Sequence, residues 1–209
     1  MGRHTGPVCR LCRREGTKLF LKGTRCDTPK CAVDRRDGVP GMHQFRRGKA
    51  SEYAIRLREK QKVKRYYGIF ERQFRKYYEE ASRRPGNTGD ALMSLLERRL
   101  DNVVTRLGFA ASRPQARQMI THGHITVNGR KLDIPSYMVR PGDQIQVKNR
   151  EHSLKLAVDN LATGSAPPVP DWLDRFSTTP PEGRVSRLPA VTDVGLPVTP
   201  QLIIELLSR

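Results

Sequence analysis

The sequence predicts an α+β fold, in which a C-terminal helix packs back on a helical domain. Three observations predict it: four cysteines close to the N-terminus, apolar residues at helical spacing through the first half, and period-two alternation around an Asn-Gly pair. We divide the chain into four regions: a cysteine arm at 1–45, a basic helical region at 46–94, a small α-α-β module at 95–160, and a proline-rich extension with a last helix at 161–209.

The arm contains all four cysteines as two close pairs, Cys9 with Cys12 and Cys26 with Cys31. This spacing suits one tetrahedral metal ion, and a shell of four sulfurs leaves no position for a catalytic water. The arm has few large apolar residues, so a metal would supply folding free energy that its core cannot. We expect structural zinc. An iron-sulfur cluster and four reduced thiols without metal remain open, whereas disulfides are disfavoured in a reducing cytoplasm.

The helical region is basic and rich in aromatic residues, with 14 Lys and Arg against 5 Asp and Glu over residues 44–84. Ser51 is expected to cap a first helix, and Gly68 to interrupt it. A second helix carries an apolar stripe that we place in the core rather than against bases. The stripe consists of Phe70, Phe74, Tyr77 and Ala81.

Four cations of this region lie within six residues: Lys60, Lys62, Lys64 and Arg65. They are too dense for the acidic neighbours to pair them all. Contacts with phosphates therefore explain them better than a solvated face does, and such contacts position a protein without reading bases.

The module begins with a helix whose apolar face carries Leu96, Leu100, Val103 and Leu107, and this helix continues one that starts near Thr88 or Asp90. Its other face is expected in solvent. The residues on that face are Arg98, Arg99, Asn102 and Arg106.

A second helix of the module has clear end signals. Ser112 and Gln115 have capping-box spacing, Pro114 lies in the first turn and Gly123 suits a left-handed stop. Because the first backbone amides of a helix lack partners, this turn offers amides and cations together to a phosphate. The alternative is that the cations are merely solvated.

Strands follow the two helices. Residues 125–127 alternate, Asn128-Gly129 is a strong hairpin signal, and Leu132 and Ile134 continue the alternation. Residues 140–143 have the composition of a second tight turn, and Ile145 and Val147 alternate again. The predicted order is α-α-β-β-β.

The extension holds eight of the fifteen prolines between residues 167 and 200. We expect it to be extended, with a strand over residues 184–188 and helix only briefly near Trp172. Thr199 and Pro200 are expected to start a last helix whose leucines and isoleucine pack on the helical region or contact a partner protein.

The net charge of +18 is concentrated: residues 1–160 hold 35 Lys and Arg against 16 Asp and Glu, and residues 161–209 hold 4 against 5. Such a potential attracts a polyanion, and nucleic acid is commoner than anionic membrane. The chain has no run of eighteen apolar residues and no secretory signal, so we expect a soluble, cytoplasmic protein without a membrane partner.

The string SRPQARQMITHGHITVNGRKLDIPSYMVRPGDQIQV resembles the RNA-binding module named after the fourth small-subunit ribosomal protein. With MGRHTGPVCRLCRREG, LERRLDNVVTRLGFAASRPQARQMITHGHI and QLIIELLSR, nearly the whole chain resembles bacterial-type small-subunit ribosomal protein four of the zinc-knuckle type. Family members often end in Phe-Tyr-Ser-Arg, whereas this chain ends in Leu206-Leu207-Ser208-Arg209.

The resemblance implies a primary binder of small-subunit ribosomal RNA in the ribosome, which nucleates assembly of the subunit body and affects translational accuracy beside proteins five and twelve. It implies metal ligation by Cys9, Cys12, Cys26 and Cys31. The RNA-facing motif of the family matches Arg113, Gln115, Arg117, Gln118, His124, Asn128 and Lys131.

Charge, clustering and resemblance together give the candidate RNA-binding residues. They are Arg10, Arg13, Arg14, Lys22, Arg35, Arg36, Arg46, Arg47, Lys49, Arg56, Lys60, Lys62, Lys64, Arg65, Arg72, Lys76, Arg83, Arg113, Gln115, Arg117, Gln118, His122, His124, Asn128 and Lys131.

Two other functions fit parts of the sequence. The same surface would let the chain regulate translation by binding the messenger RNA of ribosomal proteins, as the resemblance to the family implies for some bacteria. An RNA-modifying enzyme with the same module would need a catalytic domain, for which residues 161–209 are too short. The sequence lacks a nucleotide-binding glycine loop, a metalloprotease helix and a nucleophile elbow, so we predict that the chain is not an enzyme.

Overall fold

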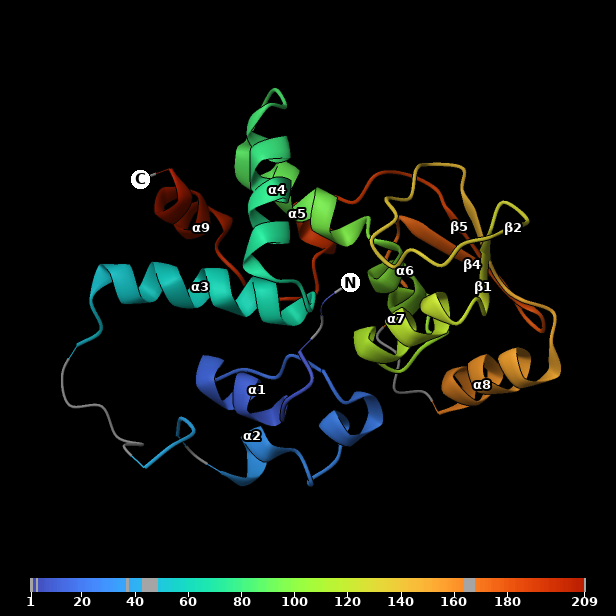
Figure 1. Cartoon of the computed structure of the whole chain (residues 1–209), viewed down its shortest axis with the longest axis horizontal. Coiled ribbons are helices and arrows are strands. Elements are labelled where there is room, and N and C mark those ends of the chain that lie inside the picture. The colour runs from blue at the N-terminus through green and yellow to red at the C-terminus, as the bar shows by residue number, and fades with distance from the viewer. Residues whose placement is uncertain (1, 3, 37, 43–48, 164–167, 209) are drawn as a thin grey trace. The chain divides into compact units, whose positions relative to one another are not determined.

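The computed structural model describes residues 2, 4–36, 38–42, 49–163 and 168–208. It has the predicted α+β class, with helices in the first half and an antiparallel sheet in the second (Figure 1). The chain divides into two compact units, of which the first comprises residues 1–93 and 195–209 and the second residues 94–194. Each unit is described separately.

The first unit is helical. Its elements are α1 (Cys9–Glu15), the 3-10 helix η1 (Gly23–Asp27), α2 (Ala32–Arg35), α3 (Glu52–Tyr66), α4 (Glu71–Ser82), most of α5 (Thr88–Glu97) and α9 (Pro200–Leu207). The predicted cap of α3 is confirmed, because Ser51 Oγ accepts a hydrogen bond from the Ala54 N–H at 3.3 Å. Gly68 follows the end of α3 with φ 63°, a conformation that glycine adopts without a Cβ clash.

Aromatic residues form much of the core of the first unit. Tyr66 and Tyr67 are buried and meet edge to face at 5.0 Å between ring centroids. Phe74 and Tyr77 of α4 are buried as predicted, but Phe70 is 51% exposed. Phe70 lies at the N-cap of α4 with extended backbone, so its side chain does not join the helical stripe.

The last helix packs on α3, as predicted (Figure 1). Pro200 occupies its first turn, and Ile203 is fully buried. Arg56 of α3 forms an ion pair with Glu205 of α9 at 2.8 Å. Thr199 makes no side-chain cap bond, so the proline alone favours the start of this helix.

The second unit contains a break that the sequence did not predict. Where one helix was expected, α5 ends at Glu97 and α6 (Leu100–Arg106) begins after Arg99, whose backbone is extended. Arg99 forms an isolated bridge with Met138. This tertiary pairing of backbone groups outweighs the helical propensity of the Arg98-Arg99 pair.

The sheet of the second unit is antiparallel, with strand order β2-β1-β3-β5-β4. Its strands are β1 (Ile125–Val127), β2 (Arg130–Lys131), β3 (Gln144–Val147), β4 (Leu173–Thr178) and β5 (Pro181–Val185). The Asn-Gly hairpin is confirmed, since Asn128 and Gly129 both have positive φ, of 51° and 75°. The return strand β2 is shorter than predicted and excludes Leu132 and Ile134.

The β4–β5 hairpin corrects two predictions for the extension. Trp172 lies in a turn and is followed at once by β4, so the described residues around it form no helix. The strand expected over residues 184–188 instead starts at Pro181 and ends at Val185. Proline is tolerated there because it is the first residue of the strand. Trp172 is fully buried in the core, which ties the hairpin to the rest of the unit.

One hydrophobic core joins the sheet to α6, α7 (Arg113–Thr121) and α8 (Glu151–Ala162), a helix that was not predicted. The core includes Leu107, Phe109, Ile120, Val127, Ile145, Ala157 and Val185. The second unit therefore presents its polar residues on a single compact scaffold.

Candidate nucleic-acid interface and cysteine site

Carboxylates pair the dense cations of α3, contrary to the prediction that they could not all be paired. The Glu71 carboxylate of α4 forms ion pairs with Lys60 Nζ at 2.8 Å and with Lys64 Nζ at 2.7 Å. Burial acts to raise the pKa of the Glu71 carboxyl, but the hydrogen bonds from Lys60 and Lys64 outweigh it and lower the pKa to about 2. Lys60 is only 8% exposed.

The other cations of α3 are also engaged. Lys62 pairs with Glu59 on the same helix, and Arg65 pairs with Glu15 of α1. Arg56 contacts both Glu52 and Glu205. These candidate residues stabilise the first unit, and a phosphate would have to compete with a carboxylate for each of them.

The outer side of α4 is different. Arg72, Lys76 and Arg83 are exposed, and no ion pair to another described residue is found for them. In the arm, Arg10, Lys22, Arg35 and Arg36 are exposed in the same way, as is Lys49 before α3. Because these cations lie in solvent and form no ion pair with a carboxylate of the described ranges, they are the residues best placed to meet phosphates.

The remaining candidates of the first unit are less accessible. Arg13 donates a hydrogen bond to the Val39 carbonyl at 3.3 Å, and Arg14 is half-buried. Arg46 and Arg47 lie outside the described residues.

In the second unit, the face of α6 that was expected in solvent is buried. Arg99 is 1% exposed and forms a bidentate pair with Asp101, with bonds of 3.0 and 2.6 Å. Arg117 of α7 reaches the same carboxylate at 2.8 Å. Two guanidinium groups thus share Asp101, which links the start of α6 to α7.

A second buried cluster surrounds Glu97. Arg106 donates to both of its carboxylate oxygens, at 3.2 and 2.9 Å, and Asn102 donates to it at 2.6 Å. Arg113 donates to Asn102 Oδ1 at 2.9 Å and is 7% exposed. The Arg113 side chain therefore anchors the first turn of α7 to Asn102 of α6. It does not project into solvent, as the phosphate-binding prediction required.

The capping box predicted for α7 does not form. The Ser112 side chain makes no cap bond, and Gln115 Oε1 accepts instead from the Ala111 N–H at 2.8 Å. Asn128 also has a structural role, since it bonds Asp143 and the Gln144 N–H at 2.9 Å each and so joins the two tight turns.

Four of the predicted residues of the module remain exposed: Gln118, His122, Asn128 and Lys131. His124 is half-buried, its Nδ1 lies 2.8 Å from Ser153 Oγ, and burial together with the nearby His122 lowers its pKa. Within residues 95–160, sequence reasoning missed four further exposed cations: Arg130, Arg140, Arg150 and Lys155. Arg130 and Arg140 flank predicted turns, and turn residues lie at the surface, so that signal was present.

The four cysteines are free and line one small cavity of about 20 Å³. Cys12, Cys26 and Cys31 are buried and Cys9 is half-buried. Burial raises the pKa of the Cys12 and Cys26 thiols. The donor chemistry and the shared cavity fit a single thiophilic ion, although no three ligating side chains among the described residues are close enough to form a metal cluster as they stand.

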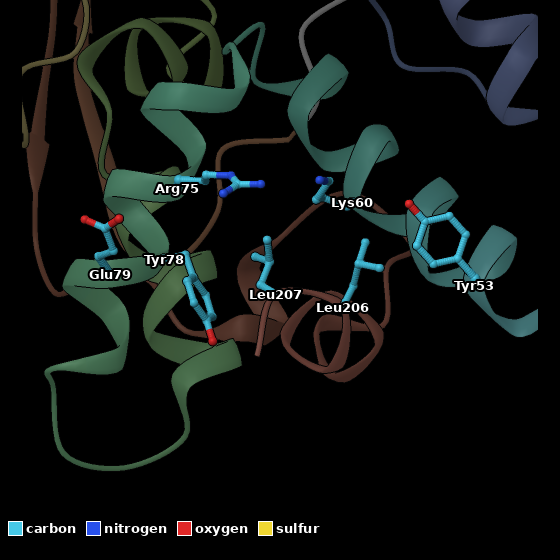
Figure 2. A pocket seen from close by; sticks show the side chains of 7 residues that line it. All are labelled: Tyr53, Lys60, Arg75, Tyr78, Glu79, Leu206 and Leu207. Carbon is cyan, nitrogen blue, oxygen red and sulfur yellow. The ribbon is translucent and has the colours of Figure 1, made fainter. Parts of the chain in front are cut away.

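The first unit also contains a cavity of about 430 Å³ between α3, α4 and α9. Figure 2 shows the side chains around it, with Lys60 and Tyr53 on α3, Arg75, Tyr78 and Glu79 on α4, and Leu206 and Leu207 on α9. Its lining mixes cations, tyrosines and leucines. Such a surface suits a contact with protein better than one with a sugar-phosphate backbone.

The helices within the described ranges include none that is both long and apolar enough to cross a membrane. A basic helical unit and a compact helix-hairpin module in one chain, with exposed cations on both, define an RNA-binding protein of the S4-domain class. Residues 98–145 match the family model described as the S4 domain, and residues 3–97 match that of the ribosomal protein S4/S9 N-terminal domain.

Curated relatives match over the full length of both chains. The chain is 57% identical over 210 residues to small ribosomal subunit protein uS4 of Thermus thermophilus, and 56% identical over 209 residues to that of Thermoanaerobacter pseudethanolicus. The chain belongs to the small ribosomal subunit protein uS4 family. As a member, it is a non-enzymatic, rRNA-binding constituent of the small ribosomal subunit, and the RNA-modifying enzyme is set aside.

Proposed function

We propose that this chain is a primary rRNA-binding protein, which docks on folded small-subunit RNA without help from other proteins, nucleates assembly of the subunit body and contributes to translational accuracy. The observation that carries the proposal is the division of cations. One set is paired with carboxylates and holds the fold, while another is exposed on the arm, on α4 and on the module.

This division favours binding to RNA that is already folded. The paired cations hold both units in a fixed form, so little side-chain and backbone freedom is lost on binding. The exposed cations meet phosphates and release counterions, which supplies affinity without reading bases. Recognition would then depend on the spacing of phosphates in a folded RNA.

The test is direct binding by the purified full-length chain to protein-free small-subunit rRNA, with an unrelated structured RNA of equal length as control. We expect clear preference for the small-subunit RNA at physiological salt. Equal affinity for the two RNAs, or binding only after other proteins are added, would contradict a primary role.

We also propose that Cys9, Cys12, Cys26 and Cys31 hold a structural zinc ion. The shared cavity of about 20 Å³ has room for roughly one water molecule, which favours a single ion over an iron-sulfur cluster. The ion would cross-link the two cysteine pairs of an arm that has little core of its own. Elemental analysis of purified protein should find one zinc per chain. Finding iron together with acid-labile sulfide would contradict the zinc site and show an iron-sulfur cluster instead.

We propose that ribosomal proteins five and twelve are neighbours of this chain, as the family resemblance implies. The cavity between α3, α4 and α9 supports a protein contact, because Tyr53 is 61% exposed beside the half-buried Leu206 and Leu207. Crosslinking from position 53 in assembled subunits should capture a protein. Crosslinks to RNA alone would contradict this assignment.

Regulation of translation by binding a messenger RNA is the second candidate function. The exposed cations favour it because they would recognise a folded RNA by the spacing of its phosphates rather than by its base sequence. A messenger RNA that folds with the same phosphate spacing would then bind as well. A messenger RNA leader that competes with small-subunit rRNA for the purified chain would support it.

A further inference from the structure

A buried carboxylate joins the cysteine arm to α3. Glu15 is the last residue of α1, and its side chain is fully buried. Its Oε1 accepts a hydrogen bond from Arg58 at 3.3 Å and another from Arg65. Arg58 and Arg65 are seven residues apart on α3 and so lie on one face of that helix. We call these three residues the Glu15 cluster.

The Glu15 cluster is more than a surface ion pair. The Arg58 and Arg65 side chains are only 31% and 22% exposed. Glu15 Oε2 is buried without a hydrogen-bond partner among the described residues, as is Thr17 Oγ1. Removing one partner of an ion pair in such surroundings is strongly destabilising, because it leaves a buried charge without compensation.

The arm and α4 each carry exposed cations, and both are anchored on α3. Glu15 docks α1 on α3, and Glu71 docks α4 on the same helix through Lys60 and Lys64. In this arrangement, α3 fixes the spacing between the arm's free cations and those of α4. A folded RNA presents phosphates at fixed positions, so that spacing determines how many contacts form together.

We propose that Glu15 is a positioning residue for RNA recognition: through Arg58 and Arg65 it fixes the arm on α3, so that the cations of the arm and of α4 engage one folded RNA together. The inference rests on the proposed recognition of folded rRNA. Glu15 itself does not touch RNA, since its side chain is buried.

The test compares Glu15→Gln with the wild-type chain, both full-length and with measured metal content. We expect affinity for small-subunit rRNA to fall about tenfold, since a factor of ten corresponds to about 1.4 kcal/mol. Affinity for a flexible, unstructured RNA of equal length should stay within about twofold, because every cation is retained and a flexible strand adapts to their positions.

Glu52→Gln is the matched control. Glu52 is 81% exposed on α3 and pairs with Arg56, which keeps its pair with Glu205, so its replacement removes an equal charge without touching the Glu15 cluster or the exposed side of α4. Both affinities should match those of the wild type.

Equal loss of both affinities in Glu15→Gln would show a merely structural role, and no loss of either would show no role; both results overturn the proposal. If the wild type itself lacks preference for small-subunit rRNA, the proposed function fails first.

A second approach avoids dependence on one variant. Arg58→Gln and Arg65→Gln release the arm from the side of α3. Amide hydrogen exchange in α1 should accelerate in both variants while exchange in α4 stays unchanged. Unchanged exchange in α1 would contradict the coupling.

Discussion

Whether a cation is available to RNA depends on whether the fold places a polar partner, usually a carboxylate, next to it. Arg113 and Arg117 match an RNA-facing motif in the sequence, yet in the fold they contact Asn102 and Asp101. Lys131 matches the same motif and is exposed. Sequence reasoning recognises the motif but not the partner, because Asp101 lies sixteen residues before Arg117 and meets it only through the packing of α6 on α7.

Asp101 gives a prediction about stability. Replacing it with asparagine removes the carboxylate charge that the buried Arg99 and the half-buried Arg117 share, which should lower the free energy of unfolding by about 3 kcal/mol. Urea unfolding measures the change. The exposed Asp133→Asn variant serves as control and should differ from the wild type by less than about 0.5 kcal/mol. A small effect at Asp101 would refute the shared role of this carboxylate.

Glu71 gives a prediction about pH. Its folded pKa of about 2 lies below the ordinary value of 4.5, so the carboxylate stabilises the fold fully above pH 4.5. That contribution is lost as the pH falls through about 2. Melting temperature measured between pH 5 and pH 2 should therefore decline less steeply in Glu71→Gln than in the wild type. Parallel curves would show that the Lys60 and Lys64 pairs contribute nothing.

At the scale of elements, α3 and α4 both carry several cations, but these cations have different tasks. The six cations of α3 are paired with carboxylates, several of which come from α1, α4 and α9. Helical periodicity predicted both helices and the Ser51 cap correctly. It could not predict the pairing, because Glu15 and Glu205 come from opposite ends of the chain.

The exposed side of α4 is expected to carry RNA contacts. A variant with Arg72→Gln, Lys76→Gln and Arg83→Gln should bind small-subunit rRNA more weakly. Its plot of log affinity against log salt should be shallower by about 2, because up to three counterion-releasing contacts are lost. An unchanged salt dependence would place the RNA elsewhere.

The β4–β5 hairpin depends on close approach at Gly183. A Cβ at this position would lie 2.6 Å from Leu107 Cδ2 and 3.0 Å from the Asp174 carbonyl oxygen. Gly183→Ala should therefore destabilise the second unit by about 1–3 kcal/mol, measured by thermal unfolding. Thr178→Ala, on an exposed residue of the same hairpin, should have little effect. Wild-type stability in Gly183→Ala would show that Leu107 does not pack tightly on β5.

At the scale of the whole molecule, the sequence predicted the α+β class, the helix-hairpin order of the module and the packing of the last helix on the helical region. These features follow from local periodicity and turn chemistry. It did not predict that the proline-rich extension adds β4 and β5 to the sheet of the module. Strand pairing across forty residues leaves no local pattern, and the prolines, which begin strands and form turns here, concealed it.

Exposed cations are proposed to bind rRNA while paired cations hold the fold, and lysine modification of the native chain tests this division most directly. An amine-specific reagent should label Lys22, Lys76 and Lys131 readily in the free chain, and small-subunit rRNA should protect them. Lys60 and Lys64, with side chains 10% and 13% exposed, should react slowly with or without RNA. Full labelling of Lys76 and Lys131 in the RNA complex would contradict the account.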